Sequence, residues 1–284
     1  MSTFEWKARF IVEGVLPTNL PQRICDRFVL EERKEEKSKA ILSVRIIRGH
    51  VPSQQEFDEV RAIARKEATK FTKAYSVFLG RLRFRELSID QITPYRRERF
   101  ASMTVQVRGE LAISEEDWKN KKRAFEEILE TPSRRSVSLA MAHYHLALWT
   151  EPPSSFMNLM ICLEALFNDS PQELRYRISH RVANIFGKTE GKRARIFDHI
   201  QKLYKKRNDV VHGIRPVMIS KEEESLLQIY SQHSIAAFMK LQQEKKNILT
   251  KVDKAQYNEE IRKAMQSEIQ EIIESLEEKV PSLA

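Results

Sequence analysis

The stretch IFDHIQKLYKKRNDVVHG, Ile196–Gly213, predicts a long amphipathic helix. Its apolar residues recur at the three- and four-residue spacings of a helix with one buried face: Ile196, Ile200, Leu203, Tyr204, Val210 and Val211. Gly213 follows the last apolar pair and predicts a C-terminal cap in the left-handed conformation, which glycine adopts without steric cost. His212 should therefore lie in the last turn, where the helix dipole favours a protonated imidazole.

Helical patterns continue on both sides of this stretch, from Ser114 to the end of the chain. Prolines at 132, 152 and 153 separate successive helices, because proline disrupts a helix interior but is tolerated in its first turn. The predicted helices span about 133–149, 154–168, 172–186, 191–212, 220–247 and 254–279. Helices of this length with short connections favour an antiparallel bundle. We expect a bundle domain over residues 113–284.

The first part of the chain has a different pattern. Two segments, Phe4–Gly14 and Lys39–Gly49, are rich in β-branched and aromatic residues and end in glycine, as strands often do. A helix is predicted from Gln54 to Leu79, and two further strands over 81–89 and 99–111. We therefore predict a small α+β region over residues 1–112. The fold class is mainly α.

Charge is concentrated in the middle of the chain. The whole chain carries +9, whereas residues 172–215 contain twelve Lys/Arg against four Asp/Glu, a net charge of +8. A basic block of this kind favours a polyanionic partner such as nucleic acid.

Hydropathy and cysteine usage indicate where the chain works. No run of about 18 apolar residues exists, so we expect no membrane span. The N-terminal sequence lacks the apolar run of a secretory signal, and we expect a cytoplasmic protein. Cys25 and Cys162 lie far apart among apolar residues, which predicts reduced core thiols instead of a zinc site.

Three residues near the end of the 191–212 helix suit phosphodiester cleavage by the 2′-hydroxyl of RNA: Arg207, Asn208 and His212. A histidine can remove or return a proton near neutral pH, an arginine can neutralise charge on the phosphorane oxygens, and the asparagine can orient either group. This chemistry requires no metal, and we expect no cofactor. Arg207 and His212 are five residues apart, about 140° around an ideal helix. One helix cannot hold a phosphate between them, so the spacing predicts a homodimer with two helix ends at a common cleft.

Other residues are expected to support this site. Glu164 lies in an otherwise apolar helix, where a carboxylate needs a partner, and both Arg181 and Arg207 are candidates. The pair serves either to orient the arginine or only as a structural ion pair. We expect RNA phosphates to contact Arg177, Lys205 and Lys206. Arg177 and Arg181 share a helix face and can extend this surface. The histidines of the basic block at 180 and 199 are expected at the surface.

Three segments occur in an order and at separations that resemble a known family. They are LEALF (Leu163–Phe167), ELRYRISHRVANIFG (Glu173–Gly187) and IQKLYKKRNDVVHG (Ile200–Gly213). Over about 133–245 the chain resembles the ApeA-like branch of the HEPN superfamily. The resemblance implies an all-α bundle, dimerisation through the motif helices and metal-independent ribonuclease activity. Such domains recur in toxin and anti-phage abortive-infection systems, and some relatives keep the fold without the activity. In such an effector, the α+β region over residues 1–112 is expected to sense a trigger or to position the RNA.

Two other functions remain open at this stage. The same bundle can serve as a non-catalytic RNA-binding or dimerisation module. An antitoxin-like regulatory role is the other alternative, in which the acidic segment Lys251–Val280, with eight acids against five bases, binds another protein.

Overall fold

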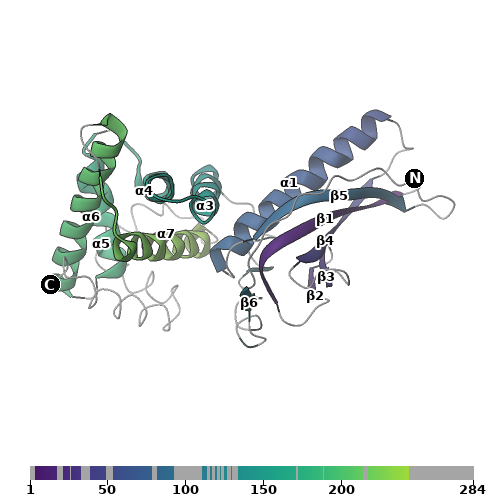
Figure 1. Cartoon of the computed structure of the whole chain (residues 1–284), viewed down its shortest axis with the longest axis horizontal. Coiled ribbons are helices and arrows are strands. Elements are labelled where there is room, and N and C mark those ends of the chain that lie inside the picture. The colour runs from purple at the N-terminus through teal and green to yellow at the C-terminus, as the bar shows by residue number, and fades with distance from the viewer. Residues whose placement is uncertain are drawn as a thin grey trace. The chain divides into compact units, whose positions relative to one another are not determined.

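The structure is a computed structural model of the chain, and it falls into two compact units, Met1–Glu130 and Thr131–Ala284. It describes residues 4–17, 22–25, 27–32, 39–48, 54–78, 82–92, 111–113, 134–170, 172–187, 189–213 and 217–242, together with positions 116, 119, 122, 125, 126 and 129. Within these residues the chain is mainly helical and includes an antiparallel sheet, which confirms this part of the predicted fold class (Figure 1).

The first unit is a sheet with a long helix packed against it (Figure 1). Its elements are β1 (Phe4–Pro17), β2 (Gln22–Cys25), β3 (Phe28–Glu32), β4 (Lys39–Arg48), α1 (Gln54–Phe78), β5 (Leu82–Ile92) and β6 (Leu111–Ile113). The strand order is β2-β3-β4-β1-β5, and β6 pairs with β1 in parallel. Phe10 lies opposite Leu42, and Leu42 opposite Leu30, so buried apolar side chains share one face. The Phe28 ring contacts the α1 side chain Phe71, with 5.2 Å between centroids.

Strands β2 and β3 were not predicted, although the first unit was correctly predicted to contain strands and a helix. In β3 the buried Phe28 and Leu30 alternate with the half-buried Val29 and Glu31, which is the period-two pattern of a strand. The charged run that follows obscured this short alternation. The predicted strand over 99–111 lies outside the described residues except at its last position.

The boundary between the units falls after Glu130, whereas the sequence analysis placed it at 112/113. The difference arises because Phe125 and Leu129, which follow residue 113, are fully buried and contact residues of the first unit. Phe125 contacts Phe71 and Tyr75 edge-on, with centroids 5.2 and 5.6 Å apart. Arg27 and Lys70 both donate to the backbone carbonyl of Leu129. Phe125 and Leu129 therefore belong to the hydrophobic core of the first unit.

The second unit is a set of packed helices, α3 (Arg135–Ala147), α4 (Ser154–Phe167), α5 (Leu174–Phe186), α6 (Glu190–His212) and α7 (Lys221–Gln242) (Figure 1). Helix α4 is central, because it packs against α3, α5, α6 and α7. Its buried face includes Phe167, whose ring contacts Phe238 of α7 edge-on at 5.1 Å. The ends of these helices were predicted to within two residues, except that the predicted end at 247 lies outside the described residues. The predicted helix over 254–279 lies outside the described residues, and no helix within them is long and apolar enough to cross a membrane.

Candidate functional site

Helix α6 begins and ends with capping interactions. The Thr189 hydroxyl accepts a hydrogen bond from the Lys192 backbone N–H at 3.3 Å, so one of the unpaired donors of the first turn is satisfied. Gly213 ends the helix with φ 61° and ψ 26°, and its N–H donates to the last-turn carbonyls. The predicted left-handed cap is confirmed. His212, the last residue of α6, is exposed.

Arg207 points toward α4 and pairs with Glu164. Its Nε lies 3.2 Å from Glu164 Oε1, and its Nη2 donates to Oε2 at 3.5 Å. The Nε and Oε1 atoms are buried and too poorly aligned for a hydrogen bond, so the pair is held mainly by charge and by the Nη2 contact. Of the two partners that the sequence allowed for Glu164, the structure therefore selects Arg207.

Two further side chains hold the Arg207 guanidinium. Its Nη1 donates to Asn208 Oδ1 at 3.3 Å, and its central carbon lies 5.6 Å from the centroid of the Tyr204 ring. Tyr204 is buried, and burial together with the charge of Glu164 raises its pKa to about 12. The phenol therefore stays neutral, and the guanidinium of Arg207 is in contact with both a carboxylate and an aromatic ring.

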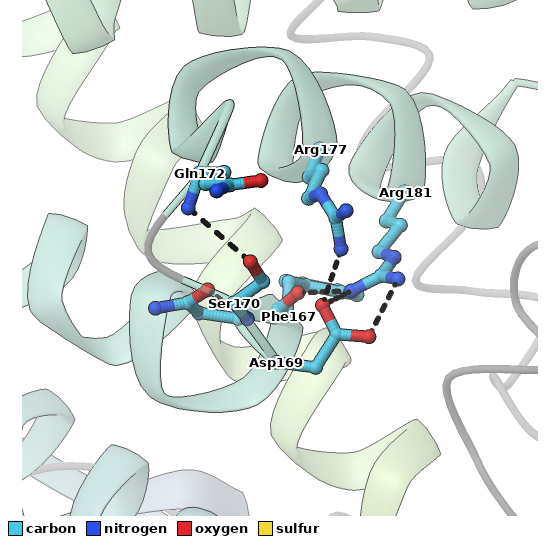
Figure 2. Close-up of polar contacts among 7 residues, drawn as sticks. Phe167, Asp169, Ser170, Gln172, Arg177 and Arg181 are labelled. Atoms are coloured by element: carbon cyan, nitrogen blue, oxygen red, sulfur yellow. Dashed lines mark hydrogen bonds and ion pairs between the residues drawn. The ribbon is translucent and has the colours of Figure 1, made fainter.

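Arg181 and Arg177 turn toward Asp169, as Figure 2 shows. The buried Arg181 makes a two-pronged ion pair with Asp169, both contacts at 3.1 Å, and also donates to the backbone carbonyl of Phe167 at the end of α4. Arg177 donates to the same carboxylate at 2.8 Å. These bonds hold the pKa of Asp169 below its usual range.

Arg181 therefore ties α5 to the end of α4 and is neither a partner of Glu164 nor part of an exposed phosphate surface. Asp169 was not predicted as a partner of these arginines, because its position in the link between α4 and α5 does not show which arginines will reach it.

The adjacent lysines Lys205 and Lys206 have different environments. Lys206 pairs with both carboxylate oxygens of Glu223 on α7, at 2.6 and 2.7 Å, and donates to the Met218 carbonyl at 3.1 Å. It connects α6 to α7 and the residues before it, which leaves it poorly placed for the RNA contact predicted for it. Lys205 is exposed and retains that expectation.

His199 is buried, with 1% of its surface exposed, so the prediction of a surface position was wrong. It lies on the apolar face of α6 beside Ile196, Ile200 and Leu203, and its ring is 6.4 Å from that of Tyr230 on α7. Within the described part of the chain neither ring nitrogen has a hydrogen-bond partner. Burial lowers the pKa of His199 to about 4, with Glu223 acting in the opposite direction and Lys202 and Lys206 adding to the shift.

Acid should destabilise the second unit through this histidine. The unfolded chain protonates His199 below about pH 6.5, whereas the folded chain resists protonation down to about pH 4. The free energy of unfolding should therefore fall as pH drops from about 6.5 to about 4, by about 3 kcal/mol from this residue. Urea unfolding at pH 7 and 4.5 should show a smaller difference for His199→Leu than for the wild type. His212→Gln, which changes an exposed histidine of the same helix, is the control, and an unchanged pH dependence in His199→Leu would contradict the assignment.

Two further observations concern metal binding and similarity to known proteins. Among the described residues no group of three or more His, Cys, Asp or Glu side chains is arranged to hold a metal ion. No protein-family model matches the chain, and neither curated proteins nor solved structures give a match.

Proposed function

We propose that the chain is a metal-independent endoribonuclease of the HEPN type that acts as a homodimeric defence effector, in abortive infection or as a toxin. The observation that carries this proposal is the end of α6. There an arginine is held by Glu164 and Tyr204, and an exposed histidine follows five residues later. Preorganised charge of this kind stabilises a transition state without reorganisation during the reaction. The order of the three segments that resemble the ApeA-like branch adds to it.

The reaction requires a ribose 2′-hydroxyl next to the scissile phosphate. The His212 imidazole removes the 2′-hydroxyl proton, the 2′-oxygen bonds to phosphorus, and the bond from phosphorus to the 5′-oxygen breaks. The leaving 5′-oxygen takes a proton from an imidazolium. Arg207 neutralises the charge that builds on the non-bridging oxygens, and Asn208 orients the guanidinium to which it is hydrogen-bonded. The products are a 2′,3′-cyclic phosphate and a 5′-hydroxyl.

Two copies of the chain complete the site in this proposal. Arg207 faces α4, and His212 is exposed about 140° away around α6, so one copy does not present both groups to one phosphate. We expect sedimentation at micromolar concentration to give a two-fold dimer with the α6 helices near the axis. A strict monomer would contradict this arrangement.

Cleavage of RNA in the presence of a chelator tests the proposal directly. Purified wild-type chain should cleave total RNA with EDTA present, and His212→Ala prepared in parallel should not, which controls for contaminating nucleases. If the wild type binds RNA but leaves it intact under all conditions tested, the chain is an RNA-binding module and the enzymatic proposal fails.

A further inference from the structure

A shallow groove of about 640 Å³ lies between the start of α5 and the middle of α6, apart from the Arg207–Glu164 pair. Its lining includes Arg175, Tyr176, Phe197, Asp198, Gln201 and Lys202, and we call it the α5–α6 groove. The groove is formed because Gln201 donates to the backbone carbonyl of Arg175 at 3.4 Å, which holds the first turn of α5 against α6.

The groove contains an aromatic ring that the fold leaves open to solvent. Tyr176 has 54% of its surface exposed, among the highest values for a large hydrophobic side chain in the described residues. Its ring is nonetheless held in place, because it stacks on His180 with an interplanar angle of 10° and contacts Phe197 edge-on with 5.5 Å between centroids. A rigid, exposed ring has little conformational entropy to lose when a planar ligand stacks on it.

The polar groups around Tyr176 carry both signs of charge. Arg175 and Lys202 are exposed and basic, whereas Glu173 and Asp198 are exposed and acidic, and Gln201 adds an amide. A site that bound only phosphate would not contain these two carboxylates. A nucleobase edge, by contrast, presents donors and acceptors side by side, and carboxylate and amide groups pair with such edges.

The groove lies on the face of α6 that leads to His212. At 100° per residue, Asp198, Lys202, Lys205 and His212 fall within about 80° of one another, and all four are exposed. Gln201 and His212 are separated by about 16 Å along the helix at 1.5 Å per residue. A short single strand with one base in the groove would therefore run past Lys205 toward the helix end.

We propose that the α5–α6 groove binds one unpaired base of single-stranded RNA by stacking on Tyr176, at a fixed distance from the scissile phosphate. The inference deepens the proposed function and rests on it for the identity of the ligand. Duplex RNA cannot use this groove, because its bases are stacked within the helix and unavailable to a protein ring. The groove thus selects single-stranded substrate.

Binding of a non-cleavable probe tests this inference separately from cleavage. The probe is a fluorescein-labelled, fully 2′-O-methylated RNA 12-mer, which lacks the attacking hydroxyl, and affinity is read from fluorescence anisotropy. Wild-type chain should bind the single strand more tightly than the same probe annealed to its complement. Tyr176→Ala should lower affinity about 5- to 100-fold, the range for loss of one base–aromatic stack, and Tyr176→Phe should retain it. Leu139→Ala, which alters another exposed apolar side chain, should behave as wild type.

An abasic scan makes the test independent of the folding of any variant. Removing the base at one probe position at a time should weaken wild-type binding at one dominant position, and Tyr176→Ala should be insensitive to that removal. Equal affinity of Tyr176→Ala and wild type, equal affinity for single strand and duplex, or no binding by the wild type would each overturn the inference. If the probe binds and Tyr176→Ala weakens it as expected while unmodified RNA stays intact, base binding by the groove stands and the ribonuclease proposal fails.

Discussion

Replacing His212 by alanine should lower the rate of RNA cleavage by about two to four orders of magnitude, the usual contribution of a general acid–base group. His212 is exposed at the end of α6, and the proposed mechanism requires it to contact the substrate. Arg207→Ala should give a loss of similar size, because it removes the positive charge that stabilises the phosphorane in the proposed mechanism. Asn208→Ala should have a milder effect, since Asn208 acts through its 3.3 Å contact with Arg207.

RNA affinity should change much less than rate in the His212→Ala and Arg207→Ala variants. Most phosphate contacts are expected from exposed basic side chains such as Lys205 and Arg175, not from the reacting groups. Anisotropy with the 2′-O-methylated probe and single-turnover cleavage of the unmodified RNA separate the two effects. Arg135→Ala removes an exposed arginine from α3 and is the charge control. Parallel losses of affinity and rate in His212→Ala would indicate that the histidine only binds RNA.

Much of the helical half could be predicted because its helices carry a strong apolar period and end at prolines and a glycine. The cap at Gly213 is a local property, since a left-handed residue after the last turn needs only glycine at that position. Short strands were harder. Strand β3 has only five residues, too few for a clear alternation of buried and exposed side chains in the sequence. Its buried face is identified by the contact of Phe28 with Phe71 of α1.

The pairing of charged residues could not be predicted, because it depends on which helices become neighbours. The sequence allowed two partners for Glu164, and Arg207 is the one that pairs with it because α4 packs against α6. Lys206 differs from Lys205 only because Glu223 of α7 lies within reach of it. His199 resembled a surface histidine from the surrounding basic residues, yet its position relative to Ile196 and Leu203 places it on the buried face. Helical phase was the stronger signal than local composition.

A single deoxyribose at the scissile position should abolish cleavage completely, which is the largest effect expected for any change to the substrate. The proposed nucleophile is the 2′-oxygen of that ribose, and no group of the protein can replace it. The mechanism proposed for His212 and Arg207 therefore also determines the end groups of the two RNA fragments. The upstream fragment must carry a 2′,3′-cyclic phosphate and the downstream fragment a 5′-hydroxyl.

End-group analysis after cleavage of a 12-mer with one deoxy position, moved along the strand, can measure both consequences. Substitution at the cleaved position should remove that product, while substitutions elsewhere leave it, so the effect reports the nucleophile and not general binding. The distance between the sensitive deoxy position and the position sensitive to base removal should be constant, because both are set by α6. Fragments with a 3′-hydroxyl and a 5′-phosphate would instead require an attacking water, which neither His212 nor Arg207 as placed here would explain.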